Sequence, residues 1–143
     1  MKGYEKLLLL LDLSEDSERV AAAGREVAAR WNAAIVALHV VEFIPVEPLG
    51  EATLPTVQIE EELVASARRR LRDLADRTGL AAADCRVETG NTKTEILRVA
   101  AEQRVDLIVL GSRERHGLAI LVNFTEDTVL QAAPCDVLAV RLK

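Results

Sequence analysis

Apolar residues change their spacing repeatedly along this chain, and that alternation limits the available folds more than any other feature. Three stretches, 6–13, 34–41 and 105–110, are almost continuously apolar, which is typical of strands covered on both faces. Two segments between them repeat apolar residues every three or four positions, as amphipathic helices do. Their stripes are Val20, Gly24, Val27, Ala28 and Trp31, and then Ile59, Leu63, Ala67, Leu71, Leu74 and Ala75.

Shorter signals complete the pattern of alternating strands and helices. Residues 84–89 predict a strand, and Thr92-x-x-Glu95 is a capping box that predicts the start of a third helix. Residues 125–132 predict a last helix and 137–142 a last strand. Strands that alternate with helices form right-handed crossovers in a parallel sheet. We therefore predict one doubly wound α/β domain over residues 1–143, a five-stranded parallel sheet with helices on both faces.

Composition and charge exclude several classes of protein. The formal net charge of −5, from 18 basic and 23 acidic residues, argues against a nucleic-acid-binding surface. No apolar run approaches the roughly 20 residues that span a bilayer, and the first residues lack a signal-peptide cleavage site. We therefore expect a cytoplasmic protein. Cys85 and Cys135 lack metal-ligand spacing, so we expect two buried thiols, with a disulfide as the alternative.

Candidate ligand-binding positions follow the predicted strands, because ligands bind at the carboxyl ends of parallel strands. These positions are residues 12–14, 40–41, 90–91 and 111–113. Neither a dinucleotide-binding nor a P-loop glycine motif occurs, and there is no Gly-x-Ser-x-Gly elbow. No nucleophile is paired with a base, and no cluster has metal-ligand spacing. We therefore predict no catalytic residue and no metal ligand.

Four segments, in this order, are similar to segments of the universal stress protein family. They are 6–14 (KLLLLLDLS), 89–97 (TGNTKTEIL), 105–113 (VDLIVLGSR) and 133–141 (APCDVLAVR). The resemblance covers essentially the whole chain and implies an adenine-nucleotide alpha-hydrolase-like fold. It also implies a homodimer, often paired through the C-terminal strands, with a cytoplasmic role in stress physiology. One branch of the family binds ATP through Gly-x-x-Gly-x9-Gly-Ser/Thr, and another branch lacks this motif and does not.

This chain departs from the ATP-binding motif of the family. Counting from Gly111, the second glycine position holds Glu114 and the third holds Phe124, with Thr125 at the hydroxyl position. A one-residue gap moves Asn123 to the third glycine position and Phe124 to the hydroxyl position. Two of the three glycines are missing in either alignment. Glu114 would also place a carboxylate where the triphosphate should lie.

Other parts of the family's nucleotide site are retained. Asp12 matches the family's aspartate after the first strand, and Val41 matches its hydrophobic residue after the second. Arg113, Arg115 and His116 could supply positive charge, although an exposed loop position is the better interpretation of His116. From the residues alone, Asp12 equally well ends the strand and caps the next helix. The candidate cofactor-binding residues are Asp12, Val41, Gly111, Arg113, Asn123 and Thr125.

The leading hypothesis is a dimeric, non-enzymatic stress-response protein with a degraded triphosphate-binding loop. The alternative is an adenine-nucleotide (ATP or AMP) binding protein, using Mg²⁺ with ATP, that hydrolyses ATP slowly at most. A redox or metal protein is a third hypothesis. The loop at 42–57 is either a binding lid or a surface excursion. The arginines at 68–72 either bind an anion or, the better interpretation, form a solvated helix face.

Overall fold

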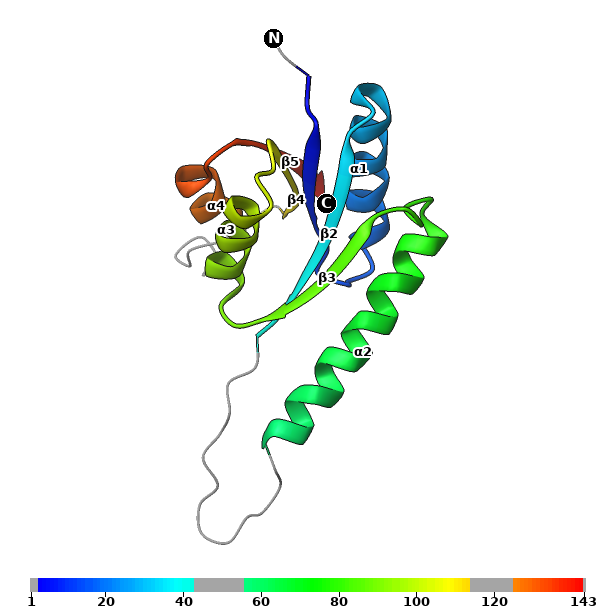
Figure 1. Ribbon diagram of the computed structural model, residues 1–143, viewed down its shortest axis with the longest axis vertical. Helices are drawn as coiled ribbons and strands as arrows, with labels where there is room; N and C mark the ends of the chain where they lie inside the picture. The colour runs from blue at the N-terminus through cyan, green and yellow to red at the C-terminus, as the bar shows by residue number, and fades with distance from the viewer. Residues whose placement is uncertain (1–2, 43–55, 114–124, 143) are drawn as a thin grey trace, which may run out of the picture.

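Strands and helices alternate along the whole described chain, as the apolar spacing predicts (Figure 1). The computed structural model describes residues 3–42, 56–113 and 125–142. Within these residues the elements are β1 (Lys6–Leu10), α1 (Ser17–Trp31), β2 (Ala34–Val41), α2 (Thr56–Arg77), β3 (Asp84–Thr89), α3 (Thr92–Glu102), β4 (Leu107–Arg113), α4 (Thr125–Ala132) and β5 (Asp136–Leu142). The loop predicted at 42–57, whether lid or surface excursion, lies outside the described residues except for Glu42 and for residues 56–57, which begin α2.

The five strands form one parallel sheet in the order β3-β2-β1-β4-β5. β1 is the central strand, and its backbone pairs with β2 on one side and with β4 on the other. Leu7, Leu8 and Leu9 are fully buried, so this strand is covered on both faces. The predicted single α/β domain with a parallel sheet is therefore confirmed. The strand order reverses direction between β1 and β4, which makes this pair the switch point of the sheet.

Two apolar cores lie on opposite faces of the sheet. Helices α1 and α2 cover one face and α3 and α4 cover the other (Figure 1). Leu7 and Leu9 of β1 belong to the α1/α2 core, whereas Leu8 between them belongs to the α3/α4 core. Neighbouring residues of a strand point to opposite faces, so a continuous apolar run can supply both cores.

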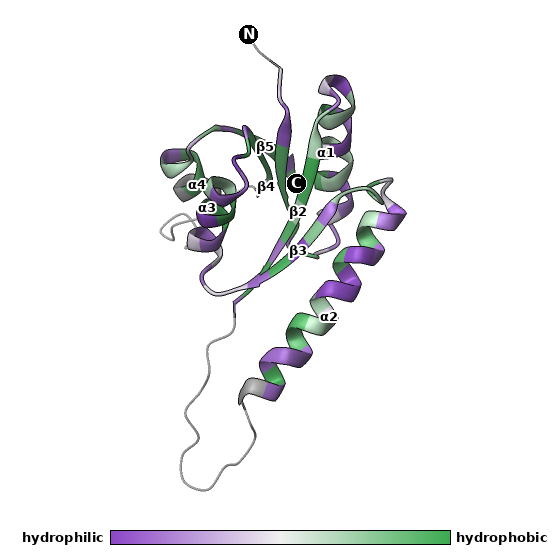
Figure 2. Cartoon of the chain, viewed as in Figure 1, coloured by the Kyte–Doolittle hydropathy of each residue, from purple (hydrophilic) through white to green (hydrophobic). Residues whose placement is uncertain are grey.

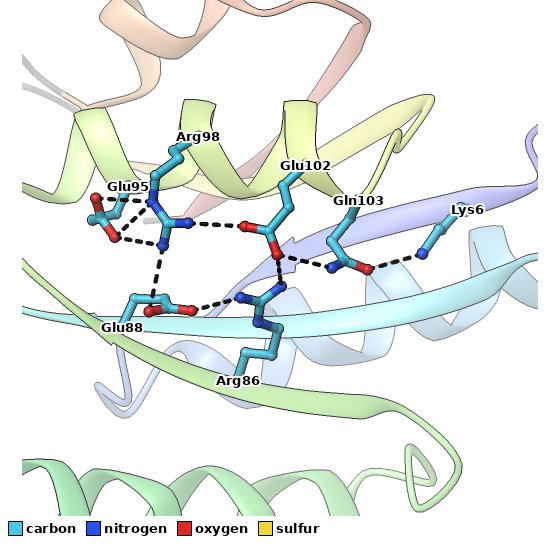
Figure 3. A network of polar contacts seen from close by, with 7 residues as sticks. All are labelled: Lys6, Arg86, Glu88, Glu95, Arg98, Glu102 and Gln103. Atoms are coloured by element: carbon cyan, nitrogen blue, oxygen red, sulfur yellow. Dashed lines mark hydrogen bonds and ion pairs between the residues drawn. The ribbon is translucent and has the colours of Figure 1, made fainter.

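Helix α3 is held over β3 by charged side chains (Figure 3). Arg86 of β3 contacts Glu88 at 2.7 Å and Glu102 of α3 at 3.2 Å. Arg98 of α3 contacts Glu88 at 3.4 Å and Glu102 at 2.8 Å, which closes a ring of two arginines and two glutamates. The hydrogen bond from Arg86 lowers the pKa of the Glu102 carboxyl. These ion pairs link α3 to β3, beside the apolar core in which α3 packs on β2.

Residues with a left-handed backbone follow two of the helices, whereas the start of α3 differs from its prediction. Asn32 ends α1 in the left-handed region (φ 53°), and Gly79 follows α2 with φ +78°. The predicted cap of α3 at Thr92 is wrong by one residue. Asn91 is the cap, because its backbone is extended and its Oδ1 accepts a hydrogen bond from the Thr94 amide at 3.0 Å.

Two predicted strands are shorter or shifted in the structure. β1 ends at Leu10 rather than at residue 13, and Leu13 has a left-handed backbone (φ 62°) that cannot continue a strand. β4 begins at Leu107 rather than at Val105, because the Val105 amide still donates to the Ala100 carbonyl at the end of α3. Both differences come from the backbone of the connecting segments, which the spacing of apolar residues does not indicate.

Both cysteines are free thiols and both are half-buried, so the disulfide alternative is wrong and the expected burial is only partial. Burial raises the pKa of the Cys85 thiol and of the Cys135 thiol. This direction favours the neutral, less reactive form of each thiol. In the segments that the structure describes, no helix is both long and apolar enough to cross a membrane.

The predicted helical stripes are buried only in part. Ala67, Leu71, Leu74 and Ala75 of α2 are buried against the sheet. Ile59 and Leu63 of the same stripe are 37% and 43% exposed, and Trp31 at the end of α1 is 46% exposed. Figure 1 shows the reason for α2, since its first half projects past the sheet. The apolar spacing of a helix therefore predicts which of its faces is apolar, but not how much of that face the sheet covers.

This difference within α2 predicts unequal costs of truncating its leucines. Leu71→Ala should lower the free energy of unfolding by about 2–5 kcal/mol, because it leaves a cavity in the core. Leu63→Ala, the matched control in the same helix, should change it by less than about 0.5 kcal/mol in the monomer. Urea unfolding of both variants at low protein concentration measures this difference. Equal losses would contradict the packing described for α2.

Candidate functional site

Three candidate residues meet at the carboxyl edge of the sheet. Asp12 follows β1, Val41 ends β2 and Gly111 lies near the end of β4. Leu9 of β1 is in register with Val109 of β4, which brings Gly111 level with the residue before Asp12. Asp12 and Gly111 therefore flank the switch point between β1 and β4, where doubly wound sheets bind their ligands.

The Asp12 carboxylate organises the connection between β1 and α1. Its Oδ1 accepts hydrogen bonds from the Ser14 amide at 3.0 Å, the Ser14 hydroxyl at 2.7 Å and the Ser17 hydroxyl at 2.9 Å. Asp16, the residue before the first turn of α1, makes no side-chain capping bond. Asp12 thus has the local structural role that the sequence offers as one of its two interpretations.

Helix α2 also supports this connection, through a residue that the sequence does not single out for that role. Arg70 donates a hydrogen bond to the Leu13 carbonyl at 2.8 Å, at the residue whose backbone is left-handed. Arg72 donates to the Ala81 carbonyl at 3.0 Å and pairs with Asp76. The arginine run is therefore not simply a solvated face, because two of its members bind backbone carbonyls.

A polar hollow of about 410 Å³ lies beside the same connection, between the start of α1 and the second half of α2. Ser14 and Glu15 lie on one side of it and Arg70 on the other. Arg77 and Glu18 also line this hollow, and they form an ion pair across it. Acidic and basic groups are both present on its walls, so its lining does not select for an anion.

The first turn of α3 lies at the same edge of the sheet and is occupied by groups of the chain itself. Glu42, directly after β2, accepts a hydrogen bond from the Thr92 amide at 2.9 Å. This contact holds the pKa of the Glu42 carboxyl below its usual range. Glu42 is not among the candidate residues predicted from the sequence. The one sequence signal that could have indicated it is an acidic residue directly after a predicted strand. Because Asn91 binds the Thr94 amide, two amide groups of this turn are already satisfied.

Gly111 has a packing reason to be glycine. A Cβ at this position would lie 2.6 Å from Cδ1 of Leu142 and 3.1 Å from Cγ2 of Val20. Both side chains belong to the α1/α2 core. At the glycine that the family motif assigns to a phosphate loop, a larger side chain would thus overlap Leu142 of β5 and crowd Val20 of α1.

The remaining candidates are placed only in part. Arg113 is the last residue of β4, and Thr125 is the first residue of α4. Asn123, and with it Glu114 and Phe124, lies outside the described residues. Within those residues no group of three or more His, Cys, Asp and Glu side chains could hold a metal ion.

Comparison with known proteins identifies the family. Residues 3–141 match the model of the universal stress protein family. The chain is 33% identical over 144 residues to "Universal stress protein A homolog 2" of Coxiella burnetii, covering 100% of this chain and 99% of that protein. The chain therefore belongs to the universal stress protein family.

Solved structures show the same fold. The universal stress protein UspA of Lactobacillus plantarum superposes with a TM-score of 0.70 at 23% identity, covering 99% of this chain and 100% of that one. A universal stress protein in complex with cAMP superposes with a TM-score of 0.72 at 19% identity, covering 98% of each chain. The predicted adenine-nucleotide alpha-hydrolase-like fold is thus confirmed.

The contact of Gly111 with Leu142 predicts an energetic coupling between the two positions. Gly111→Ala should destabilise the protein by about 1–3 kcal/mol, because the added methyl overlaps a packed side chain. The same substitution should cost less in a Leu142→Ala background, which removes the nearest atoms. Urea unfolding of the two single variants and the double variant completes the cycle. Strictly additive losses would show that Leu142 is not what excludes a side chain.

Proposed function

We propose that this protein is a stress-response member of its family that works as a cytoplasmic dimer and neither binds nor hydrolyses ATP. The observation that carries the proposal is the state of the triphosphate motif. Two of its three glycines are replaced in either alignment, by Glu114 and by Phe124 or Asn123. The one that remains, Gly111, has a packing role. Backbone amide groups cannot approach phosphates closely where bulky or acidic side chains intervene.

The edge of the sheet at β5 supports the dimer. In the order β3-β2-β1-β4-β5 this strand pairs with β4 alone. Leu138, in the middle of β5, is 37% exposed, and three of the other six residues of the strand are exposed too. An apolar edge strand is a template for pairing with another chain. A second copy related by a two-fold axis would present the same edge and cover both.

The dimer is tested by mass in solution. Sedimentation at micromolar concentration should give twice the 15.6 kDa of one chain. Leu138→Lys should shift the mass to that of one chain, because it places like charges on both sides of the two-fold axis. Ala22→Lys on the exposed face of α1 adds the same charge and should leave the dimer intact. If the natural chain sediments with the mass of one chain, the dimer proposal is wrong.

A second candidate function is the binding of a small adenine nucleotide. Asp12 and Gly111 flank the switch point of the sheet, which favours a ligand at this place. The solved universal stress protein in complex with cAMP has a similar fold and holds a nucleotide with a single phosphate. A ligand with one phosphate makes no use of the triphosphate positions at which this chain departs from the motif.

Calorimetric titration separates the two candidates. Under the first proposal, ATP with Mg²⁺ should give no binding heat, and the purified protein should carry no nucleotide. Under the second, cAMP or AMP should bind and Asp12→Ala should weaken that binding. Micromolar binding of ATP by the natural chain would overturn the first proposal. In that case Glu114→Gly should tighten binding, because it removes a carboxylate from the phosphate position.

A further inference from the structure

The first half of α2 carries an apolar face that no described part of the chain covers. Ile59 and Leu63 continue the buried stripe of Ala67 and Leu71, at the same helical spacing, yet they are exposed. Figure 2 shows the hydrophobic bands of α2 running into the half that projects past the sheet. Exposed apolar side chains at core spacing are what an unpartnered interaction surface presents.

A hollow lies on this projecting half, and the described residues that line it all belong to α2. Its volume is about 450 Å³. The lining residues are Ile59, Glu62, Leu63, Ala65, Ser66 and Arg69. Since no other described element contributes to it, the hollow opens away from the domain. The short side chains of Ala65 and Ser66 lie between the longer ones, so a second helix can approach the backbone there.

The charges of α2 are divided along its length. Glu60, Glu61 and Glu62 precede Ala65 and Ser66, and three consecutive arginines, 68–70, follow them. Glu62 and Arg69 are seven positions apart, two turns of helix, so they lie on the same face. Both are exposed, and neither takes part in an ion pair within the described parts of the chain. A helix charged in this way is complementary to an antiparallel copy of itself.

We propose that the first half of α2 is a self-association surface whose occupant is α2 of a second copy of this chain. The two helices run antiparallel about a two-fold axis at Ala65 and Ser66. Each Glu62 then faces Arg69 of the other copy, and the pairing occurs twice by symmetry. Leu63 of each copy packs on the aliphatic stem of an arginine of the other. No unrelated partner is needed to satisfy this pattern.

This contact is separate from the pairing of β5 edges proposed above. The two surfaces lie on different elements, α2 and β5, so a chain can use either one alone. Two short helix faces bury less than the roughly 1,200 Å² of a stable interface, so the α2 contact is weak in isolated chains. In a β5-paired dimer the two α2 faces would join one dimer to others. The association is therefore dependent on concentration.

Charge reversal tests the proposal, measured in a Leu138→Lys background so that β5 pairing does not mask the result. Sedimentation equilibrium up to about millimolar protein should show mass rising from one chain toward two. Glu62→Arg and Arg69→Glu should each raise the dissociation constant at least about tenfold, because both pairs become like-charged. The double variant Glu62→Arg/Arg69→Glu should restore association, because the charges are complementary again.

The matched controls are Glu26→Arg and Arg30→Glu, which make the same charge changes at exposed positions of α1. Neither should alter the association. The proposal is overturned if the Leu138→Lys chain stays monomeric over the whole range. It is equally overturned if the single reversals associate as the parent chain does, or if the double variant stays as weak as the single ones. Circular dichroism confirms that each variant is folded.

A cysteine at the two-fold axis gives an independent readout of geometry. Ser66→Cys should place two thiols close enough to form a disulfide between chains on mild oxidation. A covalent dimer should then appear on a non-reducing gel for this variant and not for Ala22→Cys on α1, which is also exposed. Equal cross-linking of the two variants would show random collision and contradict the antiparallel arrangement.

Discussion

The pairing of β1 on both of its sides is the interaction on which the rest of this structure depends. Its backbone bonds to β2 and β4, and its leucines are fully buried on alternate faces. Each helix packs on a core to which β1 contributes, so a slip of one residue would exchange the two faces. After Lys6, which begins the strand, every residue up to Leu11 is leucine, and Asp12 is the next polar residue.

The carboxyl edge of the sheet is held together by polar groups of the chain itself. Asp12 binds two serines of the connection to α1, Glu42 binds the first turn of α3, and Arg70 binds the Leu13 carbonyl. These contacts shape the edge before any ligand arrives. None of these contacts uses a residue at which this chain departs from the family's phosphate-binding motif.

Much of the fold could be predicted because its signals are local. Residues 34–41, 84–89 and 125–132 have the predicted bounds, since turn or capping residues flank apolar runs of clear period. The end of β1 and the cap of α3 were predicted at the wrong residues. Both depend on the backbone and hydrogen bonds of the connecting segments, which the spacing of apolar residues does not reveal. At the site, Asp12 could be predicted by its place after a strand. The contribution of Arg70 could not, because it depends on a contact with Leu13 across 57 positions of sequence.

By itself the sequence determined the order of strands and helices, the parallel sheet and the burial of β1 on both faces. Those properties follow from the period of apolar side chains within short windows. Only the tertiary structure decided that β5 is an edge strand and that α2 projects past the sheet. It also decided that side chains of Leu142 and Val20 occupy the space beside Gly111. These properties depend on which distant segments pair and how long each is relative to its neighbour. No local period encodes such pairings, because their free energy comes from contacts between residues far apart in the chain.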